Sequence, residues 1–542
     1  MRVGIRTLLL AVGLPSFAVA ASEPSEPSSR APSPSVAPAA RRYRLATRHT
    51  PTSVRQGNRR LDWNNKPSLY PSYPGAATLA LPAPARLDRP ALAAVESSRL
   101  PTAGGEPRAL DRTTLGTILF LAGGITGVRP GSGGDLRATA SAGALYPNEI
   151  YVVTGPLPDL DAGIYHYEPK AHRLAVLRSG DWRGDLANAA ADDGVRTAPG
   201  TVVVTGILWR SAWKYGERGY RHLFWDGGMM LAHFLAAADA ARLPARILGA
   251  FVDEKVDRLV GADGRQEVSL ALVPLGAPVT AVPAPSAHDE NVLPPTPPSS
   301  AHAPAPIDHP EALRYHAASR LGDAAAVHAL RSARPAPAAA AKPGVLRHLP
   351  EPAVARGDPS LDAVIRRRRS TRRFAQGRIS AAELAAVIER STRGTPADFL
   401  AGQSTLLDVF VIVNAVDDVA PGSYRYDRQR NGLELIASGD FRTAAGFLCL
   451  EQDLAHDASA VLFYLSDLDA VGRAFGERGY RLAELEAGLV AGRAYLAAYA
   501  TGRGATGLTF YDDEVTRFFF APPASSVGAL LVVAAGAPRR QR

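Results

Sequence analysis

The chain has 542 residues, of which 46% are hydrophobic and 21% are charged, and its net charge is +9. This composition is typical of a soluble globular protein, and the length calls for more than one domain. The positive charge is spread thinly and no long apolar run follows the first residues, so we expect neither nucleic-acid binding nor a membrane span. The single cysteine, Cys449, excludes an internal disulfide framework and a cysteine-based metal cluster.

The first residues carry two competing signals. A basic start, an apolar run and the small residues Ala18-Val19-Ala20 form the pattern of a secretory signal. Pro15 interrupts the apolar run, and the Ser-, Pro- and Ala-rich stretch behind it predicts a disordered leader over residues 1–42. A periplasmic or secreted protein and a cytoplasmic protein are both compatible with this start.

Helix and strand signals then alternate along the chain. Runs of β-branched and apolar residues predict buried strands; these runs are 150–154, 201–205, 268–275, 409–413, 460–464 and 527–534. Long, Ala-rich apolar stretches predict buried helices at 224–241 and 482–500, and helical spacing predicts one linker helix over 310–330. The pattern indicates an α+β fold in which a mixed sheet is flanked by helices.

Three blocks of sequence occur twice, in the same order and at nearly the same spacing. Gly-Glu-Arg-Gly-Tyr-Arg stands at 216–221 and at 476–481, and the blocks that flank it also recur. Such a long repeat indicates a duplicated globular domain. The repeated charges Glu217, Arg218, Glu477 and Arg478 favour a structural ion pair or a helix start over a catalytic role.

The repeat and the composition together predict the domain organisation. A domain over 43–278 and a second one over 344–537 are separated by a Pro- and Ala-rich linker with a helix. The remaining parts are the leader 1–42, the linker 279–343 and a basic tail 538–542.

Two segments carry residues suited to a cofactor. Arg366–Arg373 clusters guanidinium groups around Ser370, and such a cluster can hold a phosphate, although a solvated basic segment is the more common outcome. Ser141–Asn148 contains small residues and a Gly directly before a strand, which would let the backbone approach a planar ligand, although tight turns often look similar.

At this point the chain resembles the nitroreductase superfamily, and within it the SagB/ThcOx-type FMN-dependent azoline dehydrogenases. The resemblance spans nearly all of 43–537. It rests on four strings: Arg368–Phe374, Ser141–Pro147, Lys214-Tyr215 before the repeated motif, and Leu61–Pro82.

The resemblance implies two fused nitroreductase-like domains that form an intramolecular pseudo-dimer with FMN at its interface. It assigns the phosphate to Arg368, Arg369, Ser370 and Arg372. It places Ser141, Ala142, Gly143 and Ala144 along the flavin ring, and the backbone of Thr509 and Phe510 at the N5 edge. Phe510 weakens the last assignment, because a Gly is common there in the family.

The two halves have lost complementary parts of this site. The first half has Arg99–Gly105 where the second half has its arginine motif. The second half has Leu400–Leu407 and Ala474-Phe475 where the first half has the Ser141 loop and Lys214-Tyr215. The resemblance therefore implies one FMN site, assembled from both halves.

Lys214 and Tyr215 are the predicted catalytic pair. Oxidising an azoline removes one ring hydrogen as a hydride and another as a proton, and Lys or Tyr can accept the proton if its surroundings lower its pKa. Without the resemblance, a surface Lys and a core Tyr would be the more common interpretation.

The resulting hypothesis is an FMN-dependent oxidoreductase that converts azoline rings to azoles in a ribosomally made peptide. Its partners would be the peptide and a cyclodehydratase-type enzyme, and association beyond the pseudo-dimer stays open. The alternatives are an NAD(P)H-dependent nitro or quinone reductase and a non-catalytic scaffold that binds a peptide or partner. We favour a cytoplasmic location, because a protein exported unfolded would have to acquire its flavin elsewhere.

Overall fold

Two sheets form the framework of the protein in a computed structural model, which describes residues 36–57, 60–96, 107–129, 131, 133–280, 293–300, 303–335, 345–352, 358–402, 404–520 and 526–539. The described residues belong to one unit that begins at Val36. None of their helices is both long and apolar enough to cross a membrane.

Within the described residues, the first-half sheet has six strands in the order β1-β6-β5-β4-β7-β8. They are β1 (Thr78–Ala80), β4 (Asn148–Thr154), β5 (Gly163–Glu168), β6 (Arg173–Ser179), β7 (Gly200–Ile207) and β8 (Glu267–Leu275). A separate hairpin is formed by β2 (Ile125–Val128) and β3 (Asp135–Arg137). All pairings between these strands are antiparallel.

The second-half sheet repeats this order with one strand added, as β14-β15-β13-β10-β11-β12-β9. Its strands are β9 (Leu346–His348), β10 (Asp408–Val413), β11 (Gly422–Asp427), β12 (Gly432–Ser438), β13 (Ala460–Asp467), β14 (Gly504–Leu508) and β15 (Val527–Gly536). The six predicted strands are all present, and with the helices described next they confirm the α+β fold.

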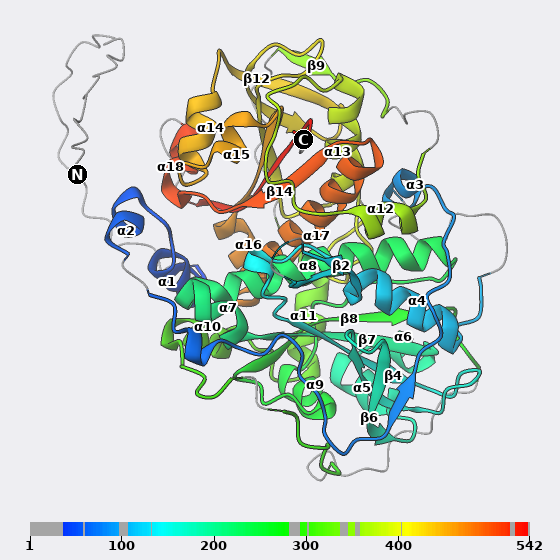
Figure 1. Ribbon diagram of the computed structural model, residues 1–542. Helices are drawn as coiled ribbons and strands as arrows, with labels where there is room; N and C mark the ends of the chain where they lie inside the picture. The colour runs from blue at the N-terminus through cyan, green and yellow to red at the C-terminus, as the bar shows by residue number, and fades with distance from the viewer. Residues whose placement is uncertain are drawn as a thin grey trace. The chain divides into compact units, whose positions relative to one another are not determined.

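Two long buried helices, α8 (Gly219–Ala240) and α17 (Arg478–Ala500), lie between the sheets (Figure 1). Both begin earlier than predicted, inside the repeated motif. Their backbones cross closely at Gly228 and Gly488, where an added Cβ would lie 2.2 Å from the Leu485 carbonyl oxygen and 2.3 Å from the Trp225 carbonyl oxygen. Glycine is therefore required at this crossing.

Each half also starts with a matching helix. The leader was expected to be disordered to residue 42, but α1 spans Pro38–Ala46; the predicted linker helix is instead two helices, α10 (Pro310–Ala318) and α11 (Ala324–Ser332). The Tyr43 hydroxyl donates to the Glu217 carbonyl and the Tyr315 hydroxyl to the Glu477 carbonyl. The two tyrosine rings stack at 5.1 Å, so α1 and α10 are a further repeated element.

The repeated arginines bind across the two halves. Arg218 and Arg221 of the first half reach Asp512 at 2.8 and 2.7 Å, and Arg478 and Arg481 of the second half reach Asp253 at 2.7 and 3.0 Å. These aspartates begin the helices α18 (Asp512–Phe519) and α9 (Asp253–Val260). The exchange of ion pairs, with the central helices, joins the halves into a pseudo-dimer and confirms the structural role expected for Arg218 and Arg478.

Candidate functional site

The Ser141 loop and the Lys214-Tyr215 pair lie against each other. Tyr215 ends helix α7 (Leu208–Tyr215), and Gly143 lies in the loop before β4 with φ of +63°. A Cβ on Gly143 would lie 2.8 Å from the Tyr215 hydroxyl oxygen and 3.1 Å from Lys214 Nζ. Gly143 is therefore needed both for its backbone conformation and for the approach of this pair.

The loop is held in place by Asp226 of α8, a residue that the sequence analysis did not single out. The Ser141 hydroxyl donates to its carboxylate at 2.5 Å, and the Ala142 amide donates to both of its oxygens at 3.2 Å. Ala144 and Tyr146 have φ of +55° and +46°, unusual values for residues with a side chain. The hydrogen bonds to Asp226 offset this backbone strain.

Asp226 has an unusual protonation equilibrium. Burial raises the pKa of its carboxyl to about 7, against the opposing effect of the hydrogen bonds from Ser141 and Ala142. Near neutral pH the protonated and the charged form of this carboxyl are therefore both populated.

Tyr215 is surrounded so that it keeps its proton. Burial and then the charge of Asp226 raise the pKa of its phenol, and the charge of Arg372 lowers it only in part. Its ring stacks on His222 at 4.1 Å, and burial lowers the pKa of that imidazole well below its usual value. The surroundings of Tyr215 therefore raise the pKa of its phenol instead of lowering it. Lys214 is exposed beside it, with Nζ 5.4 Å from the ring centroid.

The predicted phosphate arm follows helix α12 (Leu361–Arg367). Two of its arginines are held by backbone carbonyls, and a third is exposed. Arg368 is buried and donates to the carbonyls of Arg137 and Ala138 at 2.9 and 3.0 Å, so it ties the arm to β3 of the first half. Arg369 donates to the carbonyls of Arg366 and Arg368. Arg372 is exposed and makes no hydrogen bond or ion pair with any residue that the structure describes.

Ser370 and strand β14 are linked through Tyr495 of α17. The Tyr495 hydroxyl lies 3.5 Å from the Ser370 hydroxyl and accepts a hydrogen bond from the Gly507 amide. Beyond Gly507, the Thr509 hydroxyl lies 3.2 Å from His49 Nδ1, while the Phe510 ring is fully buried. The Phe510 side chain therefore belongs to the core.

The corresponding place in the other half is filled by the protein itself. Gly249 and Ala250, which precede α9 as Leu508 and Thr509 precede α18, donate their amides to the Asp398 carboxylate at 2.8 and 3.2 Å. Arg331 of α11 binds the same carboxylate at 2.9 Å. The equivalent arginine segment, 99–105, lies outside the described residues.

The second half keeps the acid that holds the loop but not the loop itself. Glu486 of α17 accepts hydrogen bonds from the Thr405 hydroxyl and the Leu406 amide at 2.6 and 2.8 Å. Thr405 stands only three residues before β10, whereas Ser141 stands seven before β4. The second half therefore lacks the residues equivalent to Gly143 and its neighbours.

Comparison with known proteins agrees with this duplicated architecture. The sequence model described as "Nitroreductase family" matches residues 106–277 and again 365–535. A protein of Methanocaldococcus jannaschii named as a nitroreductase is 29% identical over 163 residues, which is 30% of this chain and 78% of that protein.

A crystal structure of an Anabaena variabilis protein, also named as a nitroreductase, superposes with a TM-score of 0.72 at 24% identity. The match covers 92% of this chain and 99% of that one, and at this identity it supports the fold alone. The two domain matches together cover more than half of the chain, so the chain belongs to the nitroreductase family, a family of oxidoreductases.

Proposed function

We propose that the chain is an FMN-dependent oxidoreductase that converts azoline rings to azoles in a ribosomally made peptide, at one site shared by both halves. The observation that carries the proposal is the contact of Lys214 and Tyr215 with Gly143 in the first half. The charge of Arg372, from the second half, acts on the Tyr215 phenol at the same place.

The residues at this site fit FMN. Arg372 is an exposed guanidinium that no described residue neutralises, so its charge is available to a phosphate. Gly143 presents backbone without a side chain, which suits a flat ring. Arg368, by contrast, already donates two of its N–H groups to the first half, which leaves it a smaller share in holding the phosphate.

Bound FMN would supply the acceptor for a hydride from the azoline ring. The chain has to take up the accompanying proton, and the surroundings of Tyr215 raise the pKa of its phenol, so Lys214 Nζ is the proposed acceptor. Tyr215 then orients the pair through its stack on His222. Oxygen or another acceptor would return the flavin to its oxidised state.

The test is turnover of an azoline-containing peptide by the flavin-loaded protein, followed by the mass loss of two hydrogens per ring. Lys214→Ala should abolish turnover and retain the yellow colour, whereas Lys170→Ala, a change at an exposed lysine in the same half, should preserve turnover. Unchanged turnover in Lys214→Ala would remove the proposed base.

The family match supports a second candidate, an NAD(P)H-dependent nitro or quinone reductase. Oxidation of NAD(P)H with a nitroaromatic, together with no azoline turnover, would select it. Protein that is colourless and stays so after addition of FMN would favour a non-catalytic scaffold instead.

A further inference from the structure

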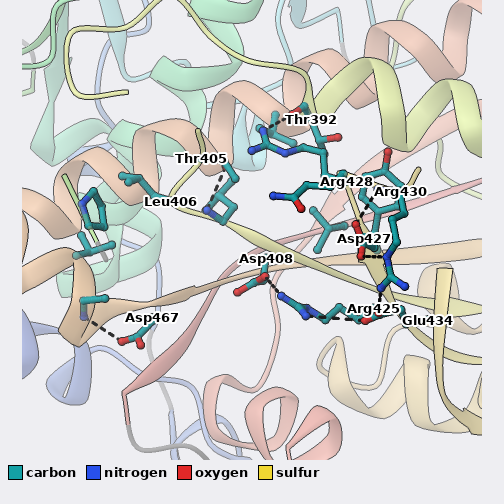
Figure 2. Close-up of a pocket in the computed structure, with 18 of the residues that line it drawn as sticks. Thr392, Thr405, Leu406, Asp408, Arg425, Asp427, Arg428, Arg430, Glu434 and Asp467 are labelled. Atoms are coloured by element: carbon teal, nitrogen blue, oxygen red, sulfur yellow. Dashed lines mark hydrogen bonds and ion pairs between the residues drawn. The ribbon is translucent and has the colours of Figure 1, made fainter. Parts of the chain in front are cut away.

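A cavity of about 510 Å³ lies in the second half, at the start of β10, the end of β11 and beside helix α16 (Leu468–Phe475). Figure 2 shows Asp408 and Arg425 paired within it, with Thr405 and Leu406 nearby. Its lining includes none of the residues proposed to bind FMN. The volume falls in the range of about 300–1,000 Å³ that is usual for ligand sites.

The equivalent place in the first half is closed off from solvent by other parts of the chain. Strand pairing aligns Asp408 with Glu149 and Arg425 with His166, because Asp408 pairs with Leu465 of β13 as Glu149 pairs with Thr205 of β7. The first-half pair, at 3.0 Å, is 0% and 1% exposed, while the second-half pair, at 2.9 Å, is 26% and 34% exposed. The corresponding cross-strand pair of side chains is thus buried in one half and open in the other.

A segment of the chain itself, Asp62–Tyr73, provides the cover in the first half; after a 3-10 turn at Trp63–Asn65 it contains no further helix or strand. Its Trp63 ring lies 5.2 Å from the Trp213 ring, and the Trp213 indole donates to the Asp62 carbonyl at 2.7 Å. At its other end, the Tyr73 ring lies 5.1 Å from the His166 ring. Trp213 and His166 correspond to Arg473 and Arg425, which both line the cavity of the second half.

Three features that occupy this place in the first half are missing from the sequence of the second half. Arg210, which binds Glu149 and the Tyr146 carbonyl, is replaced by Ala470, and Tyr146 has no counterpart in the shorter loop. The chain ahead of β9, which joins β12 as β1 joins β6, contains no aromatic residue over 333–345. No side chain of that stretch could therefore reproduce the contacts of Trp63 and Tyr73.

We propose that this cavity binds an extended peptide segment of another molecule that carries aromatic side chains, as Asp62–Tyr73 binds the first half. An aromatic ring would lie over the Arg425 guanidinium, an attractive arrangement for a cation. Arg473 is exposed and makes no hydrogen bond with the described part of the chain, so it is free to donate to a peptide carbonyl, as Trp213 does.

This inference gives the chain a docking site for the proposed peptide substrate. It rests on the proposed function only for the identity of the natural ligand. The binding itself needs no redox step, so the docking site and the dehydrogenation can fail separately.

The probe is a labelled synthetic peptide with the sequence of residues 61–75, titrated onto the flavin-loaded full chain and followed by fluorescence anisotropy. We expect saturable binding. Ala470→Arg, which restores the first-half side chain, should weaken binding at least about tenfold and leave the flavin content unchanged. Thr443→Arg, which adds the same charge at an exposed position of α14 (Arg442–Leu448), should have no effect.

A peptide with alanine at the positions of Trp63, Tyr70 and Tyr73 should bind more weakly than the parent peptide. The proposal is overturned by a lack of saturable binding to the unmodified chain, or by equal binding to the Ala470→Arg variant. Binding that occurs only after removal of residues 336–344 would also overturn it, because the linker of the chain would then be the occupant.

Discussion

At the residue scale, the site depends on acids that are buried in the two central helices. Asp226 holds the Ser141 loop, and Glu486 holds the shortened loop of the second half through the same kind of hydroxyl and amide contacts. A single acid in an apolar helix gives no sequence signal of its partners, because they come from a distant loop. The Ser141 loop and the Lys214-Tyr215 pair, by contrast, could be assigned to one site from the sequence, because both match motifs of the family that the chain resembles.

Replacement of Asp226 by Asn should change how stability depends on pH. The pKa of about 7 in the folded state exceeds the value of about 3.9 expected in the unfolded state, so the folded chain binds the extra proton between these values. The contribution of Asp226 to the free energy of unfolding therefore falls as pH rises through this window.

Asp226→Asn does not titrate and can still accept both hydrogen bonds. Its free energy of unfolding relative to the natural protein should rise by about 1.4 kcal/mol for each pH unit between about pH 5 and pH 7, and level off above that. Urea unfolding at about pH 5 and pH 8 measures this rise. The same difference from the natural protein at both pH values would contradict it.

Arg372 and Arg373 provide a matched pair for the cofactor arm, since both are exposed and adjacent. Arg372→Ala should release FMN during gel filtration, because a charged hydrogen bond to phosphate is lost, at a cost of about 1.5–3 kcal/mol. Arg373→Ala should retain FMN. Equal retention in the two variants would move the phosphate site elsewhere.

At the scale of elements, the repeated motif binds the halves together through exchanged ion pairs. The sequence predicts six of the buried strands and the central helices, since their apolar runs are long. It does not predict the short edge strands β1, β9 and β14 or the likeness of α1 to α10, because short elements carry few informative positions. The exchange itself could not be predicted, because a repeat does not say which copy its side chains contact.

Asp253→Ala should destabilise the protein by about 3–5 kcal/mol, because it leaves Arg478 and Arg481 buried without their counter-charge. The control is Asp417→Ala, which breaks the exposed pair with Arg378 and should cost less than about 1 kcal/mol. Chemical denaturation compares the two variants. A similar small loss in both would show that the exchanged ion pairs do not hold the halves together.

At the scale of the whole molecule, duplication has given two pseudo-equivalent places with different contents. In one, Gly143 contacts the Lys214-Tyr215 pair, and the charge of Arg372 acts on the Tyr215 phenol. In the other, the Asp398 carboxylate accepts hydrogen bonds from the backbone amides of Gly249 and Ala250 and from the Arg331 guanidinium. The second place therefore offers no free donors at these two positions to a second flavin.

The central proposal is a single cofactor site shared by the two halves, and the flavin-to-protein ratio tests it most directly. Absorbance of the purified, FMN-saturated protein, compared with its concentration from amino-acid analysis, should give one FMN per chain. Two tightly bound equivalents per chain would contradict the proposal.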